Sequence, residues 1–234
     1  MIAICSTMMR IDIISAVPDS LTSPLNTSIL KRAQERNKVE IVVHNLRDYA
    51  YDKHKQIDDK PFGGGPGMLL KPEPFFECIE KLLNERKYDH IIFPTPGGKL
   101  FDQKMANKFS LVKNILIIAG HYKGVDDRVR EKFATDEISI GHFVLTGGEI
   151  VALAIIDAIV RLIPGVLNDS ESALNDSLMD GEFIEAPYYT RPAEYKGMVV
   201  PDVLLSGHEK KIKDWKAEQS KVLTEKWKKI NSRE

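Results

Sequence analysis

The 234-residue sequence has only two cysteines and no long hydrophobic run. Cys5 and Cys78 have no metal-ligand spacing, and two thiols are too few for a disulfide framework, which indicates incidental thiols in a reducing compartment. The most apolar stretch, residues 150–163, is interrupted by Asp157 and Arg161 and is too short to span a membrane. We therefore expect a cytoplasmic protein without a membrane segment.

The sequence also lacks a strong net charge and the known phosphate-binding loops. With 33 Lys and Arg against 34 Asp and Glu, the net charge is −1, so any nucleic-acid site has to be a local patch. No G-x-G-x-x-G follows an expected strand, and G-x-x-x-x-G-K-[ST] is absent. Residues 1–8 are too short for a secretory signal. Because a strand pattern begins at Met9, we expect them to form a loose extension, with Met1 and Met9 equally suited as the start.

Short apolar stretches alternate with helical patterns over the first 140 residues. Strands are expected at residues 10–15, 39–45, 91–93, 115–119 and 137–140. Helices are expected at residues 18–35, 72–86 and 102–111, and a further short helix follows residues 121–128 and ends at about residue 133. This alternation predicts a mostly parallel α/β sheet. Residues 46–70 show little periodicity, which indicates either a mobile functional lid or an ordinary surface loop.

Three glycine-bearing turns follow three of the expected strands, at residues 94–98, 120–124 and 140–148. Ligands of parallel sheets bind beyond the carboxyl ends of the strands, where these turns meet. The third turn opens the apolar helix, so its backbone groups are suited to a flat heteroaromatic edge or a small polar ligand. Taken alone, that turn is equally compatible with a tight strand-to-helix connection that binds nothing. Three such turns together favour a ligand site.

The second half of the chain changes in character. The helix expected at residues 150–163 is apolar on nearly every face, which favours burial both in the core and at a subunit interface. Residues 168–181 are polar and acidic and predict a linker. A helix expected at residues 208–230 carries eight lysines, which indicates either a solvated face or a surface that contacts phosphates.

Four runs of sequence closely resemble the bacterial tRNA (guanine-N1)-methyltransferase, or TrmD, family. They are D-D-K-P-F-G-G-G-P-G-M at residues 58–68, S-I-G-H-F-V-L-T-G-G-E at 139–149, R-L-I-P-G-V-L at 161–167 and Y-T-R-P at 189–192. The resemblance implies a SPOUT-type α/β fold, a parallel sheet with a deep trefoil knot, plus a small, mainly helical C-terminal domain. It further implies an enzyme that methylates N1 of guanosine 37, 3′ of the anticodon, in tRNA.

The resemblance also implies a domain organisation and partners. Residues 1–167 would form the knotted cofactor-binding and dimerisation domain, residues 168–181 a flexible linker and residues 182–234 a tRNA-binding domain. The family works as a homodimer whose subunits share each active site. Its cofactor is S-adenosyl-L-methionine. A divalent ion such as Mg2+ is implied too, although no residue here is assigned as its ligand. Carried over by position, the cofactor contacts are Pro96, Gly120, Tyr122, Ile140, Gly141, Phe143, Leu145, Gly147 and Gly148.

The chemistry needs a base, because guanine N1 carries a proton and is a poor nucleophile. The resemblance assigns this role to Asp176, and it assigns to Arg161 the positioning of the base and the stabilisation of charge that develops at O6. From the residues alone, Asp176 is not distinguished from the neighbouring acids Asp169, Glu171 and Asp180.

The turn after Gly120 departs from the family pattern. It reads His121-Tyr122-Lys123, where the family usually has Arg-Tyr-Glu, so Lys123 reverses the charge expected to meet the cofactor's amino group. Glu185 matches a family carboxylate after a one-residue insertion and is the candidate for binding that end of the cofactor. Two alternatives remain: a SPOUT methyltransferase for another RNA position, and a non-catalytic tRNA-binding module.

Overall fold

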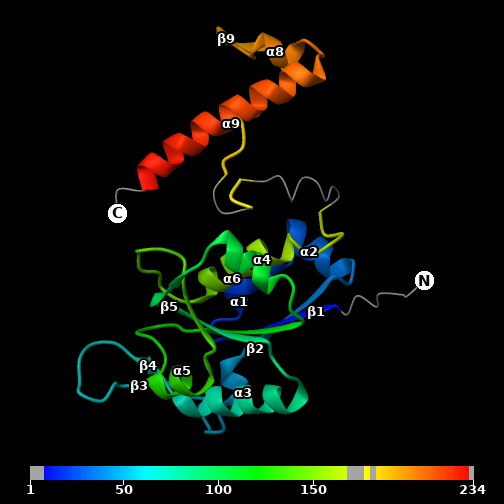
Figure 1. Cartoon of the computed structure of the whole chain (residues 1–234). Coiled ribbons are helices and arrows are strands. Elements are labelled where there is room, and N and C mark those ends of the chain that lie inside the picture. Colours follow the sequence, from blue (N-terminus) through cyan, green and yellow to red (C-terminus); the bar gives the residue numbers. More distant parts are fainter. Residues whose placement is uncertain (1–7, 168–176, 180–182, 232–234) are drawn as a thin grey trace. The chain divides into compact units, whose positions relative to one another are not determined.

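The computed structural model describes residues 8–167, 177–179 and 183–231 of the chain (Figure 1). The chain divides into two compact units, Met1–Asn168 and Asp169–Glu234. The extension expected at residues 1–8 lies outside the described residues except for its last residue, and most of the expected linker lies outside them as well.

The first unit contains a five-stranded parallel sheet, as predicted. Its strands are β1 (Met9–Ser15), β2 (Val39–Asn45), β5 (His90–Leu100), β6 (Asn114–Ala119) and β7 (Asp136–Ser139), in the order β2-β1-β6-β5-β7. The strand expected at residues 91–93 was predicted too short. β5 continues through the Pro-Gly turn and pairs with β7 on both sides of an irregularity between Pro94 and Lys99.

Helices cover both faces of this sheet (Figure 1). One face carries α1 (Asp19–Leu25), α2 (Ser28–Glu35), α4 (Gln103–Phe109) and α6 (Glu149–Val160), and the other carries α3 (Pro72–Glu85), α5 (Asp127–Phe133) and the 3-10 turn η1 (Leu46–Tyr49). The single helix expected at residues 18–35 was wrong. Two separate helices form there, α1 and α2, because the helical conformation is interrupted between them: Ser28 has a φ of 49°, outside the right-handed helical region.

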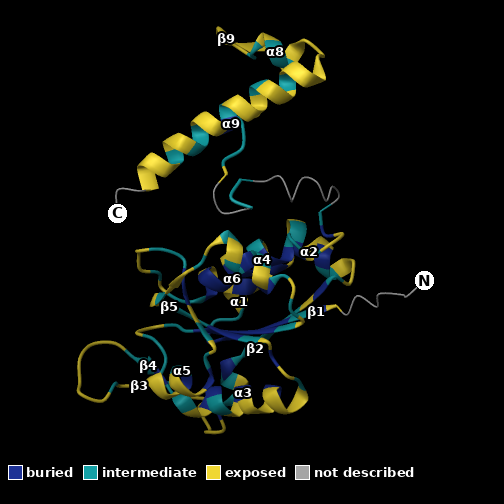
Figure 2. Ribbon diagram, viewed as in Figure 1, coloured by how far each residue is buried: buried dark blue, intermediate teal, exposed yellow. Residues whose placement is uncertain are grey.

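Each face of the sheet has its own hydrophobic core, and the sheet between them is largely buried (Figure 2). Successive side chains of a strand point to opposite faces, so a strand covered on both sides is apolar at nearly every position. In β6, Ile115 and Ile117 belong to the core under α6, whereas Leu116 and Ile118 belong to the core over α3. This explains the uninterrupted apolar run of β6 in the sequence.

Helix α6 is buried along most of its length but leaves one stripe open. Ala152, Ile155, Ile156 and Ile159 are fully buried, whereas Ile150 is 58% exposed, and Ala154 and Asp157 are exposed on the same face. The helix ends at Val160, three residues earlier than expected, and Arg161 occupies its C-cap. In the described part of the chain, no helix combines the length and apolarity that crossing a membrane requires.

The segment expected to be a long loop, residues 46–70, contains η1 and two short paired strands, β3 (Asp58–Asp59) and β4 (Leu69–Leu70). Its end is attached to the turn after β6. The Leu70 N–H donates to the Gly124 carbonyl at 3.0 Å, and the Lys123 N–H donates to the Met68 carbonyl at 3.0 Å. These bonds hold the residues that follow the glycine-rich segment 63–67 against that turn.

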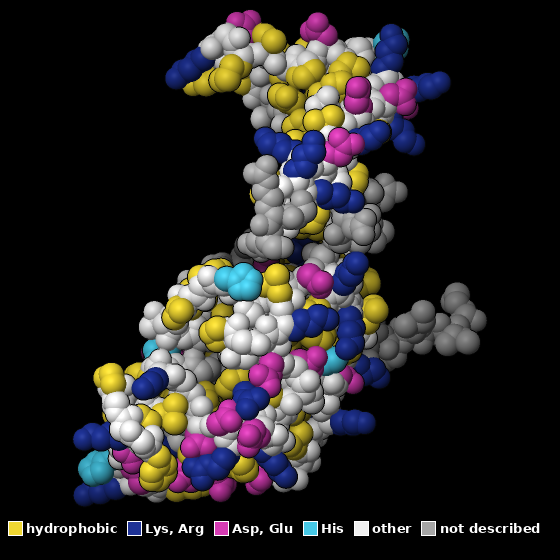
Figure 3. All heavy atoms as spheres, turned by 60° about the vertical axis from the view of Figure 1, so that its left-hand side comes forward, with side chains coloured by type: hydrophobic (Ala, Val, Ile, Leu, Met, Phe, Trp, Pro, Cys, Tyr) yellow, Lys and Arg dark blue, Asp and Glu magenta, His cyan; other side chains and the backbone are white. Residues whose placement is uncertain are grey.

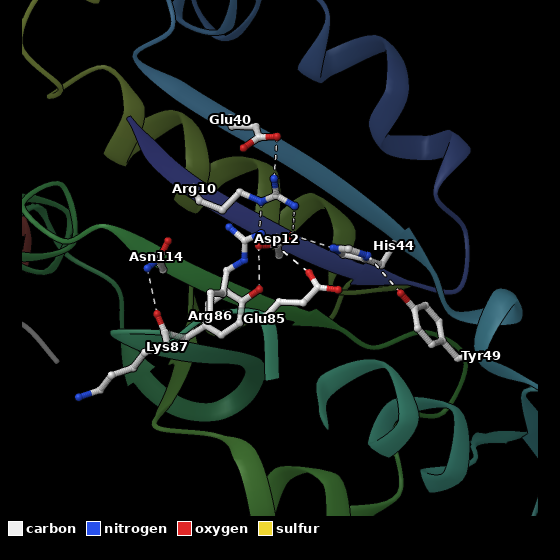
Figure 4. A network of polar contacts seen from close by, with 10 residues as sticks. Arg10, Asp12, Glu40, His44, Tyr49, Glu85, Arg86, Lys87 and Asn114 are labelled. Carbon is white, nitrogen blue, oxygen red and sulfur yellow. Dashed lines mark hydrogen bonds and ion pairs between the residues drawn. The ribbon is translucent and has the colours of Figure 1, made fainter. Parts of the chain in front are cut away.

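A buried carboxylate lies at the centre of the sheet (Figure 4). Asp12 of β1 is fully buried and accepts hydrogen bonds from Arg10 at 2.8 and 2.9 Å, from Tyr88 at 2.8 Å and from His44 at 2.7 Å. Burial alone would raise the pKa of Asp12, but the hydrogen bonds from His44, Arg10 and Tyr88 outweigh it and lower this pKa to about 2. The network ties β1 to β2 and to the segment before β5.

The second unit contains a short hairpin of β8 (Glu194–Tyr195) and β9 (Met198–Val199), followed by α8 (Asp202–Leu205) and the long helix α9 (Glu209–Asn231). Helix α9 carries eight lysines against four acidic residues. Figure 3 shows Lys and Arg side chains among hydrophobic ones on one face of this unit. Tyr188 lies under the ammonium of Lys216, at 5.8 Å, so aromatic and basic groups are interleaved here.

Candidate functional site

A cavity of about 390 Å³ lies beyond the carboxyl ends of the central strands. It is lined by the Pro-Gly turn within β5, by the turns that follow β6 and β7, and by the first turn of α6. Its volume is in the range that small-molecule sites occupy, about 300–1,000 Å³. The tertiary structure thus brings together three turns that are spread over residues 94–148 of the sequence.

Nine of the predicted site residues line this one cavity. They are Pro96, Gly120, Tyr122, Ile140, Gly141, Phe143, Leu145, Gly147 and Gly148. The cavity is also lined by residues outside the predicted set, including Thr95, His121, Lys123, Asp127, Arg130 and Val151; of these, His121 and Lys123 were noted only as departures from the family pattern. Most of these lie in or beside the same turns, so position next to the predicted residues was the available signal. Arg130 and Val151 lie on helices, and no sequence signal indicated that they line the cavity.

Gly148 allows two of the turns to meet. Its N–H donates to the Gly120 carbonyl at 2.7 Å, which joins the start of α6 to the end of β6. A Cβ at position 148 would lie 3.0 Å from the Gly120 nitrogen and 3.1 Å from the Ala119 Cα, both backbone atoms. Because backbone cannot rotate away as a side chain can, residue 148 has to be glycine for the turns to approach this closely.

We expect Gly148→Ala to push the two turns apart and to destabilise the first unit by about 1–3 kcal/mol, the usual cost of overpacking. Urea unfolding measures the loss. Gly97→Ala is a matched control, because a Cβ at Gly97 meets nothing within 4 Å and its φ is not in the left-handed region. Equal stability of the two variants would contradict the close approach at Gly148.

A buried carboxylate also connects the cavity wall to the sheet. Glu149 opens α6 with 5% of its side chain exposed. Its Oε1 accepts a hydrogen bond from the Ser15 hydroxyl at 2.8 Å, and its Oε2 lies 3.2 Å from Nδ1 of His121. One side chain therefore joins β1, the turn after β6 and α6.

The remaining charged groups of the cavity differ in their pairing. Arg130 donates to Asp127 at 2.6 and 3.0 Å and to Glu137 at 2.7 Å. The hydrogen bonds from the Arg130 guanidinium hold the pKa of Asp127 below its usual range. Lys123 is exposed, and its side chain passes Gly67 and brings Nζ close to Gly65. The cavity rim thus presents an ammonium group.

The other predicted site residues lie elsewhere. Arg161 follows α6 and is not among the described residues that line the cavity. Asp176 lies outside the described residues. Glu185 belongs to the second unit, where its carboxylate accepts hydrogen bonds from the Ser177 N–H at 3.2 Å and from the Tyr188 hydroxyl. Within the described residues, no group of three or more His, Cys, Asp or Glu side chains is arranged to hold a metal ion.

Comparison with known proteins identifies the family. The sequence profile of the family described as tRNA (Guanine-1)-methyltransferase TrmD matches residues 9–230. A Bacteroides fragilis protein named tRNA (guanine-N(1)-)-methyltransferase is 57% identical over 212 residues, which cover 91% of this chain and 94% of that protein. Proteins with the same name from Cytophaga hutchinsonii and Chlorobaculum tepidum are 57% identical over 212 residues and 54% identical over 216 residues. They cover 91% and 92% of this chain, and 90% and 94% of their own lengths. The chain therefore belongs to the tRNA (guanine-1)-methyltransferase family.

Proposed function

We propose that this protein transfers a methyl group from S-adenosyl-L-methionine, bound in the cavity of the first unit, to N1 of guanosine 37 in tRNA. As a member of its family, the protein is a tRNA (guanine-N1)-methyltransferase. The proposal adds the donor site, the position in the tRNA and the residues that act. One observation carries it: nine positions drawn from separate parts of the sequence line a single cavity of suitable size.

The cavity suits this donor in size and in chemistry. Residues of three turns line it, and backbone groups of such turns can recognise an adenine edge without charged side chains. Apolar side chains such as Pro96, Ile140 and Leu145 exclude water from the faces of a bound ring. When bound, S-adenosyl-L-methionine supplies a methyl group made electrophilic by its sulfonium. Lys123 places a positive charge at the rim, so we expect the carboxylate end of the donor to lie nearer to it than the ammonium end.

The chain's own chemistry is assigned to two side chains. Asp176 would accept the proton of guanine N1, which leaves the electron pair on N1 free to attack the methyl group. Arg161 would stabilise the negative charge that develops at O6 and would orient the carboxylate of Asp176. Glu185 is proposed to bind the amino end of the donor. Because the guanine is stacked on its neighbours in the anticodon loop, it has to be unstacked before it reaches these groups.

We further propose a deep trefoil knot and a homodimer. β5 pairs with β7 on both sides of its irregularity, and the turn before α6 bonds to the turn after β6, so the three turns are closely interlocked. The exposed stripe at Ile150, Ala154 and Asp157 of α6 offers a surface for a second copy of this chain. In such a dimer, residues 168–181 of one subunit would complete the cavity of the other.

The second unit is proposed to bind the tRNA, with residues 182–234 as the binding domain. The excess of lysines on α9 provides positive charge for phosphates, and the interleaved tyrosines offer surfaces on which bases stack. We place the reaction in the cytoplasm, where its substrate is made. A dependence on Mg2+ is part of the proposal, with its site unassigned, and chelation by EDTA tests it.

The test is a methylation assay on unmodified tRNA with S-adenosyl-L-methionine, followed by primer extension. N1-methylation blocks base pairing, so reverse transcription should stop at the guanosine 3′ of the anticodon. A stop at another nucleotide would support the alternative of a related methyltransferase with a different target. No stop, together with intact tRNA binding, would overturn the proposed function.

A further inference from the structure

His121 is held in a fixed orientation at the wall of the cavity. Its Nδ1 lies 3.2 Å from Oε2 of Glu149, and 20% of its side chain is exposed. The ring also packs edge-on against Tyr122, with centroids 5.1 Å apart. The imidazole is thus immobilised from two sides, and its residue lines the cavity.

The pairing determines which ring nitrogen carries the proton. The carboxylate of Glu149 lies at the amino end of α6, where the helix stabilises a negative charge, and it already accepts from the Ser15 hydroxyl. A carboxylate can only accept hydrogen bonds, so Nδ1 of His121 has to donate. In the neutral ring, Nε2 is then an acceptor with a fixed direction. Among the residues that the structure describes, none forms a hydrogen bond with Nε2.

Gly147 lies directly against the same pair. A Cβ at Gly147 would lie 2.2 Å from Oε2 of Glu149 and 2.5 Å from Nδ1 of His121. The third turn therefore passes directly over the Glu149–His121 contact, and His121 itself lines the cavity. Because the imidazole of His121 is already held in place, little conformational entropy is lost when a ligand forms a hydrogen bond with it.

From these contacts we infer that Nε2 of His121 accepts a hydrogen bond from a proton-bearing group of the methyl donor, and that Glu149 sets the ring for this role. The inference rests on the proposed function and assigns a donor-binding residue where the chain departs from its family's Arg-Tyr-Glu pattern. The bonding group is either a hydroxyl or amine of the nucleoside part or the ammonium of the methionine part.

His121→Asn separates this role from a structural one, because an Asn amide reproduces the Nδ1 donor to Glu149 but has nothing at the position of Nε2. Calorimetry should show about tenfold weaker binding of S-adenosyl-L-methionine, the usual effect of one lost hydrogen bond. The KM for the donor should rise with little change in kcat, the pattern of lost uniform binding. The melting temperature should stay close to that of the unaltered protein.

Titration with adenosine distinguishes the two sources of the proton. A tenfold loss for both ligands places the bonded group on the nucleoside, whereas a loss for S-adenosyl-L-methionine alone places it on the methionine part. Unchanged affinity for both would overturn the inference. If the unaltered protein binds neither ligand, the proposed donor site itself is wrong, and the two failures are thereby distinguished.

Two further variants complete the experiment. Glu149→Gln keeps the shape of the side chain, but its amide can donate to Nδ1 of His121, which turns Nε2 into a donor. The same tenfold loss of affinity for S-adenosyl-L-methionine is therefore expected, although His121 itself is unchanged. Normal affinity would contradict the role of Glu149. His90→Asn is the matched control, because Nδ1 of His90 bonds to Asp136 at 2.7 Å and His90 does not line the cavity. Donor affinity should be unaffected in that variant.

Discussion

Asp176→Ala should lower kcat by about 10²–10⁴-fold, the range that a general base contributes. Without a carboxylate to accept its proton, guanine N1 keeps that proton in the transition state and attacks poorly. Single-turnover methylation of unmodified tRNA measures the effect. The affinity for S-adenosyl-L-methionine should change little, because Asp176 is assigned to the base and not to the donor.

Asp180→Ala is the matched control for this variant. It removes an equal charge from the same acidic segment, so it should leave kcat within a few-fold of normal. If both variants lose activity equally, the segment acts through its overall charge and Asp176 is not the base. If neither loses activity, the base lies elsewhere in the chain.

Asp12→Ala should destabilise the first unit by about 3–5 kcal/mol, because it leaves buried donors without their acceptor. Arg10 would lose an ion-pair partner and His44 a hydrogen-bond acceptor in the sheet, where their side chains are only 13% and 14% exposed. Urea unfolding monitored by circular dichroism measures the change. Glu35→Ala removes an exposed partner of Lys31 on α2 and should cost less than about 1 kcal/mol.

The same carboxylate predicts how stability depends on pH. The pKa of Asp12 is lowered from 3.8 to about 2 in the folded state. A lowered folded-state pKa means that its contribution is fully present above pH 3.8 and is lost as the pH falls toward 2. The stability difference between the unaltered protein and Asp12→Asn should therefore narrow over this interval. A constant difference would contradict the assignment.

Much of the fold could be predicted because its strands are short and apolar. β1, β2 and β6 were found within a residue or two of their ends, because each is rich in the β-branched residues Ile and Val. β5 was predicted too short because Pro94 and Gly97 indicate a turn, whereas the long-range pairing with β7 keeps that segment in the sheet. The break between α1 and α2 was missed although Pro24 and Asn26 precede Ser28, since a proline inside a helical pattern indicates that the helix ends or bends.

The candidate site could be predicted only in part. The glycines of the three turns were visible as a pattern, but the partners of each turn were not. Ser15 and Glu149 lie 134 residues apart in sequence, and no local pattern relates them. His121 stood out only as a departure from the family pattern and Glu149 only as the end of a motif, and it is the fold that places the two in contact beside the cavity.

The sequence by itself determined the parallel α/β architecture, the family and the identity of the three turns, because alternating hydrophobicity and local motifs are properties of neighbouring residues. Only the tertiary structure decided how the turns meet, why residue 148 is glycine, and which carboxylate orients His121. Those facts depend on contacts between β1, β6 and α6, and packing between segments distant in the chain leaves no periodic mark in the sequence.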